Sequence, residues 1–138
     1  MIPDRSFKKY FTLAEAQAAL PLVKSIVRDI LAEGKKVMQR RTGFISEQVE
    51  RKDLIEQINT TEQYIEELES LGCFYKDWNF EIGLVDFPGI LNDQEIFWCW
   101  KSDEDEIRYY HGIEEGYAGR KLVPEELLNE KNPANNTD

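Results

Sequence analysis

The sequence has few of the side chains from which most metal and redox sites are built, because it contains two cysteines and a single histidine. The spacing of Cys73 and Cys99 matches neither a zinc motif nor a C-x-x-C redox pair. Both cysteines have apolar neighbours, so we expect two reduced, buried thiols that pack as small hydrophobic groups. The chain also lacks a P-loop, a dinucleotide-binding fingerprint and a Ser-His-Asp arrangement, which excludes the functions those motifs mark.

Long apolar runs are absent as well. None approaches the roughly 20 residues that a membrane-spanning helix requires, so no membrane association is expected. Residues 1–10 carry charges where a signal peptide would have an apolar stretch, which predicts a cytoplasmic location. The net charge is −10, composed of +3 in residues 1–50 and −13 in residues 51–138. A chain with this charge repels nucleic acid as a whole. At 138 residues, it has the length of one domain.

A long helix is predicted over residues 13–41. Thr12 and Glu15 have the spacing of a capping box at its start, and Pro21 is expected to kink it. Apolar or small residues then alternate at intervals of three and four, a coiled-coil spacing: Leu13, Ala16, Leu20, Val23, Val27, Ile30, Gly34 and Val37. A second apolar stripe means that the first half of the helix must be covered from two sides: Ala19, Leu22, Ile26 and Leu31.

A second helix is predicted over residues 46–71, with Ser46 as its N-cap and Gly72 as the residue that ends it. Two long helices joined by a short loop must lie antiparallel. The hairpin tip carries six cations: Lys35, Lys36, Arg40, Arg41, Arg51 and Lys52. Cations near a helix C-terminus stabilise the helix, which explains the cations from Lys35 to Arg41 without a function. A weak nucleic-acid contact through this tip is the functional alternative.

Residues 73–111 change to the period of β-strands and predict an antiparallel meander of three or four strands. The fold class is therefore α+β. A short helical turn and a disordered tail are expected over residues 123–138. Because the meander follows the second helix directly, we expect it to cover the first half of helix one, including Leu22 and Ile26. Trp98 and Trp100 share one strand face and should pack on the helices, whereas Trp78 should be exposed.

Candidate site residues lie near the strand ends. His111 with Asp86, Glu114 and Glu115 offers a possible divalent-metal site, although one histidine is fewer than such sites usually have. A structural histidine, bonded to a carboxylate or to the backbone, is the simpler interpretation, and a binding or catalytic histidine is the third. No other cofactor is predicted.

A ligand other than a metal has two further candidate residues. The glycines at 116 and 119 beside Arg120 resemble a backbone nest for a carboxylate or phosphate. They can equally form a simple turn, with Arg120 paired to Asp86 or to another acidic neighbour. Trp100 could line a ligand groove, although tryptophans of this kind are more often core residues.

Four collinear motifs resemble the bacterial family known as domain of unknown function 2203, over about residues 11–122. They are the segments Phe11–Ala16 with Leu20-Pro21-Leu22, Gly83–Pro88, Cys99-Trp100, and His111 followed by Gly116-Tyr117-x-Gly119-Arg120. One departure is Tyr110, where the family is associated with a tryptophan. The resemblance implies a helical hairpin followed by a β unit in a cytosolic bacterial protein, and it implies no activity.

Beside the weak nucleic-acid contact through the tip, two further classes of function remain open. The first is a non-catalytic interaction domain, most simply a homodimer formed through the helices, since a second copy would cover the apolar edge of the hairpin; no other protein partner is indicated. The second is a small-ligand or metal-binding domain, or an enzyme, that uses Asp86, His111 and Arg120 with neighbouring acidic side chains.

Overall fold

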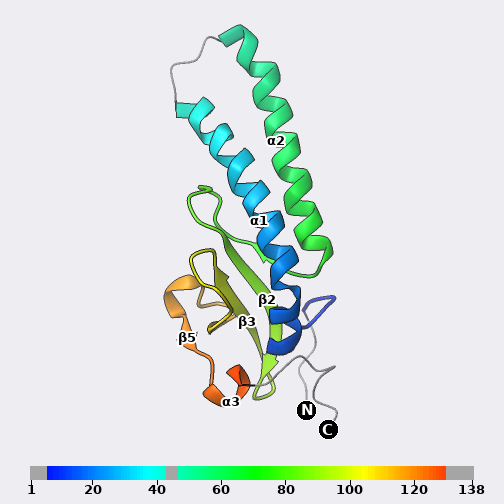
Figure 1. Ribbon diagram of the computed structural model, residues 1–138, viewed down its shortest axis with the longest axis vertical. Helices are drawn as coiled ribbons and strands as arrows, with labels where there is room; N and C mark the ends of the chain where they lie inside the picture. Colours follow the sequence, from blue (N-terminus) through cyan, green and yellow to red (C-terminus); the bar gives the residue numbers. More distant parts are fainter. Residues whose placement is uncertain (1–5, 43–46, 130–138) are drawn as a thin grey trace.

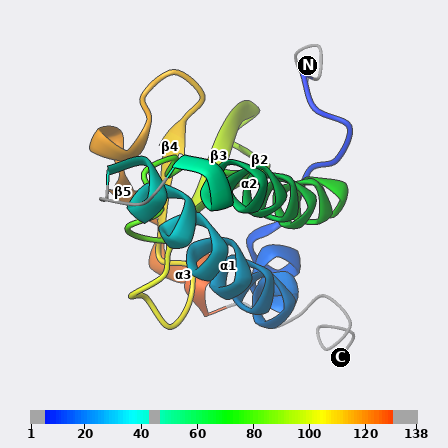
Figure 2. The same cartoon turned by 90° about the horizontal axis from the view of Figure 1, so that it is seen from above.

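The computed structural model describes residues 6–42 and 47–129, with side chains described outside 40–51. Two long helices, α1 (Leu13–Thr42) and α2 (Glu47–Ser70), precede one antiparallel sheet. They lie side by side as a hairpin, with the sheet against the lower half of α1 (Figures 1 and 2). The predicted α+β class is confirmed. The strands follow in chain order across the sheet: β1 (Phe74–Tyr75), β2 (Leu84–Leu91), β3 (Gln94–Lys101), β4 (Tyr109–Gly112) and β5 (Lys121–Leu122).

Local signals at the helix ends act as the sequence predicts. The Glu15 amide donates to Thr12 Oγ1 at 3.0 Å and the Thr12 amide donates to Glu15 Oε1 at 2.8 Å, which confirms the capping box. Gly72 adopts φ 103° and its amide donates to the Glu69 carbonyl at 2.9 Å, as expected of a residue that ends a helix. The predicted N-cap at Ser46 lies outside the described residues.

The sheet has five strands rather than the predicted three or four, and it extends to Leu122 rather than ending near residue 111. The two edge strands, β1 and β5, contain two residues each. A strand of two residues carries no alternation in its sequence, so the period of two that marks a strand could not reveal it.

The core lies between α1 and one face of the sheet. Val85, Phe87, Trp98 and Trp100 alternate along β2 and β3 and are at most 2% exposed. They join the buried stripe of α1 in one cluster, and the Trp98 indole N–H donates to the Phe11 carbonyl at 2.8 Å. The two tryptophans therefore pack on the helices, as predicted.

Leu22 does not join this core. Ile26 is buried as expected, but Leu22 is 53% exposed, so the prediction that the sheet covers it is wrong. Successive helix residues point about 100° apart. Because the sheet and α2 both engage the stripe that contains Leu20 and Val23, the side of α1 that bears Leu22 is left uncovered.

The far half of the hairpin extends beyond the sheet in Figure 1. The segment between β1 and β2 supports it, because the Phe80 ring packs so closely on α1 that a Cβ at Gly34 would lie 2.3 Å from its atoms. Trp78 is 59% exposed, which confirms the prediction. Of the basic tip, Lys35 and Lys36 are exposed on α1, and Lys36 pairs with Glu33 at 3.3 Å. The side chains of Arg40, Arg41 and Arg51 lie outside the described part.

The chain after the sheet forms a short helix, α3 (Glu125–Leu128), close to the start of α1. The tail predicted to be disordered falls largely on residues 130–138, which lie outside the described residues. Within the described ranges, no helix combines the length and the apolar character needed to cross a bilayer.

Candidate functional site

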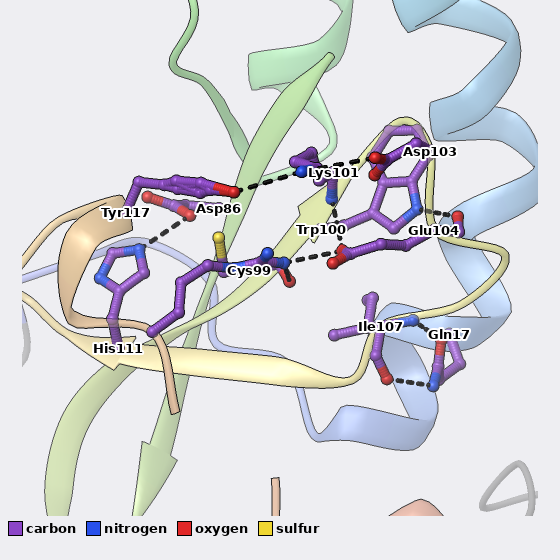
Figure 3. A network of polar contacts seen from close by, with 11 residues as sticks. Gln17, Asp86, Cys99, Trp100, Lys101, Asp103, Glu104, Ile107, His111 and Tyr117 are labelled. Carbon is purple, nitrogen blue, oxygen red and sulfur yellow. Dashed lines mark hydrogen bonds and ion pairs between the residues drawn. The ribbon is translucent and has the colours of Figure 1, made fainter. Parts of the chain in front are cut away.

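The candidate site lies on the sheet face opposite the helices. Asp86 of β2 pairs with Cys99 of β3, and Phe97 of β3 pairs with His111 of β4. Side chains alternate along a strand, so the same register that points Trp98 and Trp100 toward α1 points Asp86, Cys99 and His111 away from it. Figure 3 shows the three side chains grouped together, with Trp100 directed to the other side.

His111 is held at both ring nitrogens. It is 2% exposed, with Nδ1 at 2.8 Å from the Gly112 carbonyl oxygen and Nε2 at 3.1 Å from Asp86 Oδ1. A carbonyl oxygen can only accept, so Nδ1 carries a proton and Nε2 faces the carboxylate. Two acceptors cannot bond to each other, and a cation must therefore lie between Nε2 and Oδ1. That cation is either a proton or a metal ion.

The proton is held firmly when it occupies this position. Burial lowers the pKa of His111, but the hydrogen bond to Asp86, the charge of Asp86 and the Gly112 carbonyl together raise it above its ordinary value. Asp86 is itself 4% exposed. The site therefore contains a buried carboxylate and imidazole that share a proton in the absence of any other cation.

Cys99 completes the cluster. Its sulfur, an Asp86 oxygen and a His111 ring nitrogen all lie within 4.8 Å of one another, and all three residues are buried. Burial is the main reason that the pKa of the Cys99 thiol rises to about 12; the charge of Asp86 adds to the rise and Arg120 opposes it. Without a metal, Cys99 is a neutral thiol.

These three donors suit a transition metal ion. Tetrahedral zinc holds nitrogen and oxygen ligands at about 2.0–2.2 Å, which places them roughly 3.3 Å apart, close to the observed 3.1 Å between Nε2 and Oδ1. The Gly112 carbonyl fixes the tautomer that leaves Nε2 free to coordinate, as carbonyl partners of metal-bound histidines do. Sulfur, nitrogen and carboxylate oxygen together favour zinc or a similar ion over calcium or magnesium.

Arg120 lies beside the cluster but is not paired with Asp86. Its Nη2 donates to Glu104 at 2.7 Å and to the Cys99 carbonyl at 3.2 Å. Its guanidinium also stacks over the rings of Tyr109 at 4.1 Å and Tyr117 at 5.0 Å. Through these contacts, Arg120 links the turn at 117–119 to the sheet. It forms no ion pair with Asp86, so it does not neutralise the charge of that carboxylate.

The two glycines beside Arg120, for which a backbone nest and a simple turn were both possible from the sequence, belong to a short 3₁₀ turn, Tyr117–Gly119. A Cβ at Gly119 would lie 2.6 Å from Cβ of Glu115, so the tightness of this turn requires a glycine here. The simple-turn interpretation fits the turn better than a binding nest does.

Three other candidate residues lie outside the cluster. The Trp100 indole donates to the Glu104 carbonyl at 2.8 Å, on the helix side of the sheet. Glu115 accepts from the Gly112 amide at 2.7 Å and faces Lys121 at 3.6 Å. Glu114 is exposed. The prediction that these carboxylates would join His111 at a metal is not supported by their positions, because Glu115 is engaged at the rim and Glu114 points to solvent.

A hollow of about 260 Å³ opens over Asp86 and His111. Its lining residues come from β2, β3 and β4, from the position after β1 and from the segment after β4: Lys76, Leu84, Asp86, Phe97, His111, Ile113, Gly116 and Tyr117. A small molecule could therefore reach the buried pair from one side of the sheet.

Cys99 is the site residue that sequence reasoning missed. Its apolar neighbours Trp98 and Trp100 indicated a core thiol, and it is indeed buried and free. The signal that could have found it is the strand alternation itself, because a residue between two helix-facing tryptophans must point to the opposite face. Pairing Cys99 with Asp86 additionally required the register of β2 and β3.

Residues 9–123 match the model of a family described as an uncharacterized conserved protein, DUF2203. The chain belongs to the DUF2203 family. The match confirms the resemblance drawn from the motifs, and it contains all three members of the buried cluster. No significant match is found among curated proteins or among solved structures. The function of this DUF2203 chain must therefore be argued from its own geometry.

Proposed function

We propose that this DUF2203 domain is a metal-binding domain that holds a zinc-like divalent ion through Asp86, Cys99 and His111. The observation that carries the proposal is the convergence of three buried donors from three neighbouring strands within 4.8 Å. A buried carboxylate, thiol and imidazole without a cation require a shared proton and a neutral thiol, whereas a divalent ion satisfies all three at once. Metal binding would release protons from Cys99 and from His111.

The number of ligands bears on what such an ion would do. Structural zinc sites have four protein ligands, whereas sites that bind a substrate or activate water have three and keep one position open. The part of the chain that the structure describes supplies three such donors, and the hollow over Asp86 and His111 provides access. We infer that the ion would form a ligand-binding or catalytic centre rather than a structural metal site. A cytoplasmic location, which keeps thiols reduced, is part of the proposal.

Cobalt titration tests the metal centre directly. Protein stripped of metal with a chelator is titrated with Co²⁺, and absorption is followed from the near-ultraviolet to the visible. A thiolate-to-cobalt charge-transfer band with one ion per chain is expected, and zinc should displace the cobalt. The matched control uses the second cysteine: Cys99→Ser should abolish the band and Cys73→Ser should retain it, because both thiols are buried but only Cys99 is in the cluster.

A specific result would contradict the metal-site proposal. If folded wild-type protein gives no charge-transfer band and no bound zinc by elemental analysis, the proposal is wrong and the histidine is structural. His111→Gln provides a second check, because loss of Nε2 as a ligand should weaken cobalt binding by at least tenfold while the band persists at high cobalt.

A second candidate, dimerisation through the hairpin, is favoured by a groove between the helices. This groove measures about 270 Å³ and is lined mainly by apolar side chains: Val37, Met38, Ile58, Thr61, Glu62, Ile65, Trp78 and Phe80. Ile55 nearby on α2 is 52% exposed. The occupant we propose is a second copy of the chain.

Charge favours an antiparallel pairing of two such copies. Residues 56–70 of α2 contain five glutamates and no cation, whereas Lys35, Lys36 and Lys52 lie toward the other end of the hairpin. A two-fold axis across the groove would place the basic end of each hairpin beside the acidic stretch of its partner.

Light scattering and sedimentation test the dimer, with Ile55→Lys as the disrupting variant. Leu22→Lys is the matched control, since Leu22 on α1 is equally exposed, whereas Ile55 lies one helical turn from the groove residue Ile58. The dimer should dissociate in the first variant, persist in the second and weaken with salt. A wild-type protein that stays monomeric at millimolar concentration contradicts this second candidate.

A further inference from the structure

We propose that the hollow over the metal centre binds a small monocarboxylate with a short apolar body, whose carboxylate occupies the open coordination position. This inference rests on the proposed metal site and deepens it by naming the class of ligand.

The size of the hollow limits the ligand. A volume of about 260 Å³ accommodates roughly nine water-sized groups at about 30 Å³ each. That space suits a small organic acid and excludes a nucleotide or a peptide of several residues. The opening lies on the sheet face away from the helices, so the ligand can enter without disturbing the core.

The walls of the hollow are apolar while its floor is polar. Leu84, Phe97 and Ile113 line the sides, and Asp86 and His111 form the polar part. Ligand sites commonly combine mostly apolar walls with a few polar groups that fix orientation. A ligand that suits this hollow has one polar end, directed to the metal, and an apolar remainder. Free phosphate has no apolar part to use these walls.

The net charge of the metal-loaded site favours a ligand that carries one negative charge. A divalent ion bound by ionised Asp86, ionised Cys99 and neutral His111 has no net charge. Of the residues that line the hollow, Lys76 is then the one whose full charge remains. The neighbouring cations are engaged elsewhere, because Arg120 pairs with Glu104 at 2.7 Å and Lys101 with Asp103 at 3.4 Å.

Lys76 is positioned to supply this charge. Its ammonium lies over the rings of Phe74 at 5.8 Å and Phe97 at 5.3 Å, which keeps it above the sheet face that bears the cluster. A carboxylate at the metal would therefore have a second cation close by.

The test uses cobalt-loaded full-length protein and benzoate as the probe. Benzoate should perturb the visible cobalt spectrum saturably, whereas benzyl alcohol, which has the same ring and no charge, should not. Lys76→Met keeps the apolar stem and removes the charge, and it should weaken benzoate binding by about tenfold or more. Lys52→Met, an exposed lysine on α2 far from the hollow, should leave benzoate binding unchanged.

The outcomes separate this inference from the metal site on which it rests. If the thiolate–cobalt band forms but benzoate leaves the spectrum unchanged, the metal site stands and the ligand inference is overturned. A response to phosphate alone overturns it as well, since the apolar walls would then be irrelevant. Equal benzoate affinity in Lys76→Met and wild type overturns the role of Lys76. Failure to bind cobalt at all overturns both proposals.

Discussion

Nε2 of His111 lies 3.1 Å from Oδ1 of Asp86 while the other ring nitrogen is committed to the Gly112 carbonyl at 2.8 Å. The pair can therefore hold one cation between Nε2 and Oδ1. In metal-free protein that cation is a proton, and the protonation of His111 can be measured. His111 is the sole histidine, so its ring signals in a nuclear magnetic resonance spectrum need no assignment.

In chelator-treated protein we expect the pKa of His111 to be higher than that of an unfolded histidine, near 6.5. Burial opposes the rise, but the hydrogen bond and charge of Asp86 outweigh it. A raised pKa in the folded state stabilises the protein below the unfolded pKa, and this contribution is lost as pH rises through the folded pKa. Chemical-shift titration and urea unfolding at several pH values measure the two effects.

Asp86→Asn is the informative variant for this titration. An amide cannot stabilise the imidazolium by charge, so the pKa of His111 should fall and the pH dependence of stability should shrink. If the wild-type ring titrates below an unfolded histidine, the shared-proton arrangement is wrong.

Thiol reactivity gives a second prediction. Burial raises the pKa of both Cys73 and Cys99 to about 12, so at pH 8 only about one thiol in ten thousand is ionised. Iodoacetamide should therefore alkylate neither residue in the native, metal-free protein, and both should react once urea unfolds it. Mass spectrometry of the intact protein reports the number of modified thiols, and rapid labelling of native Cys99 contradicts its burial.

Gly34 gives a packing prediction. Gly34→Ala should destabilise the protein by about 1–2 kcal/mol, because overpacking against Phe80 costs roughly 1–3 kcal/mol while alanine regains up to about 1 kcal/mol of helix propensity. Urea unfolding measures the change. Lys35→Ala, on the exposed neighbouring position, is the control and should be nearly neutral. Combining Gly34→Ala with Phe80→Leu should recover part of the loss if the clash is its cause.

The helix cap provides a fourth prediction. Thr12→Ala removes the oxygen that accepts the Glu15 amide and should lower the free energy of unfolding by about 1 kcal/mol. Ser25→Ala, at an exposed position inside α1, should be neutral or slightly stabilising because alanine is the better helix former. Equal effects at the two positions would contradict a specific role for the cap.

The helical hairpin was predictable because its signals are local. The capping box at Thr12, the glycine at 72 and the spacing of apolar residues act within a few positions of one another. The two-residue strands and the exposure of Leu22 were not predictable, since they depend on which surfaces meet after folding. Cys99 was missed for a related reason. Its flanking tryptophans lie on the helix-facing side of β3, so they give no information about the other side, and its partner Asp86 lies on another strand.

The strand register has a consequence for how errors in this protein would be tolerated. Phe87 pairs with Trp98, and the adjacent Asp86 pairs with Cys99. A slip of one residue would turn the polar donors into the core and expose the aromatic rings to water. Misassembled molecules would therefore be unstable, so the packing of the aromatic core also selects the register that brings Asp86 and Cys99 together.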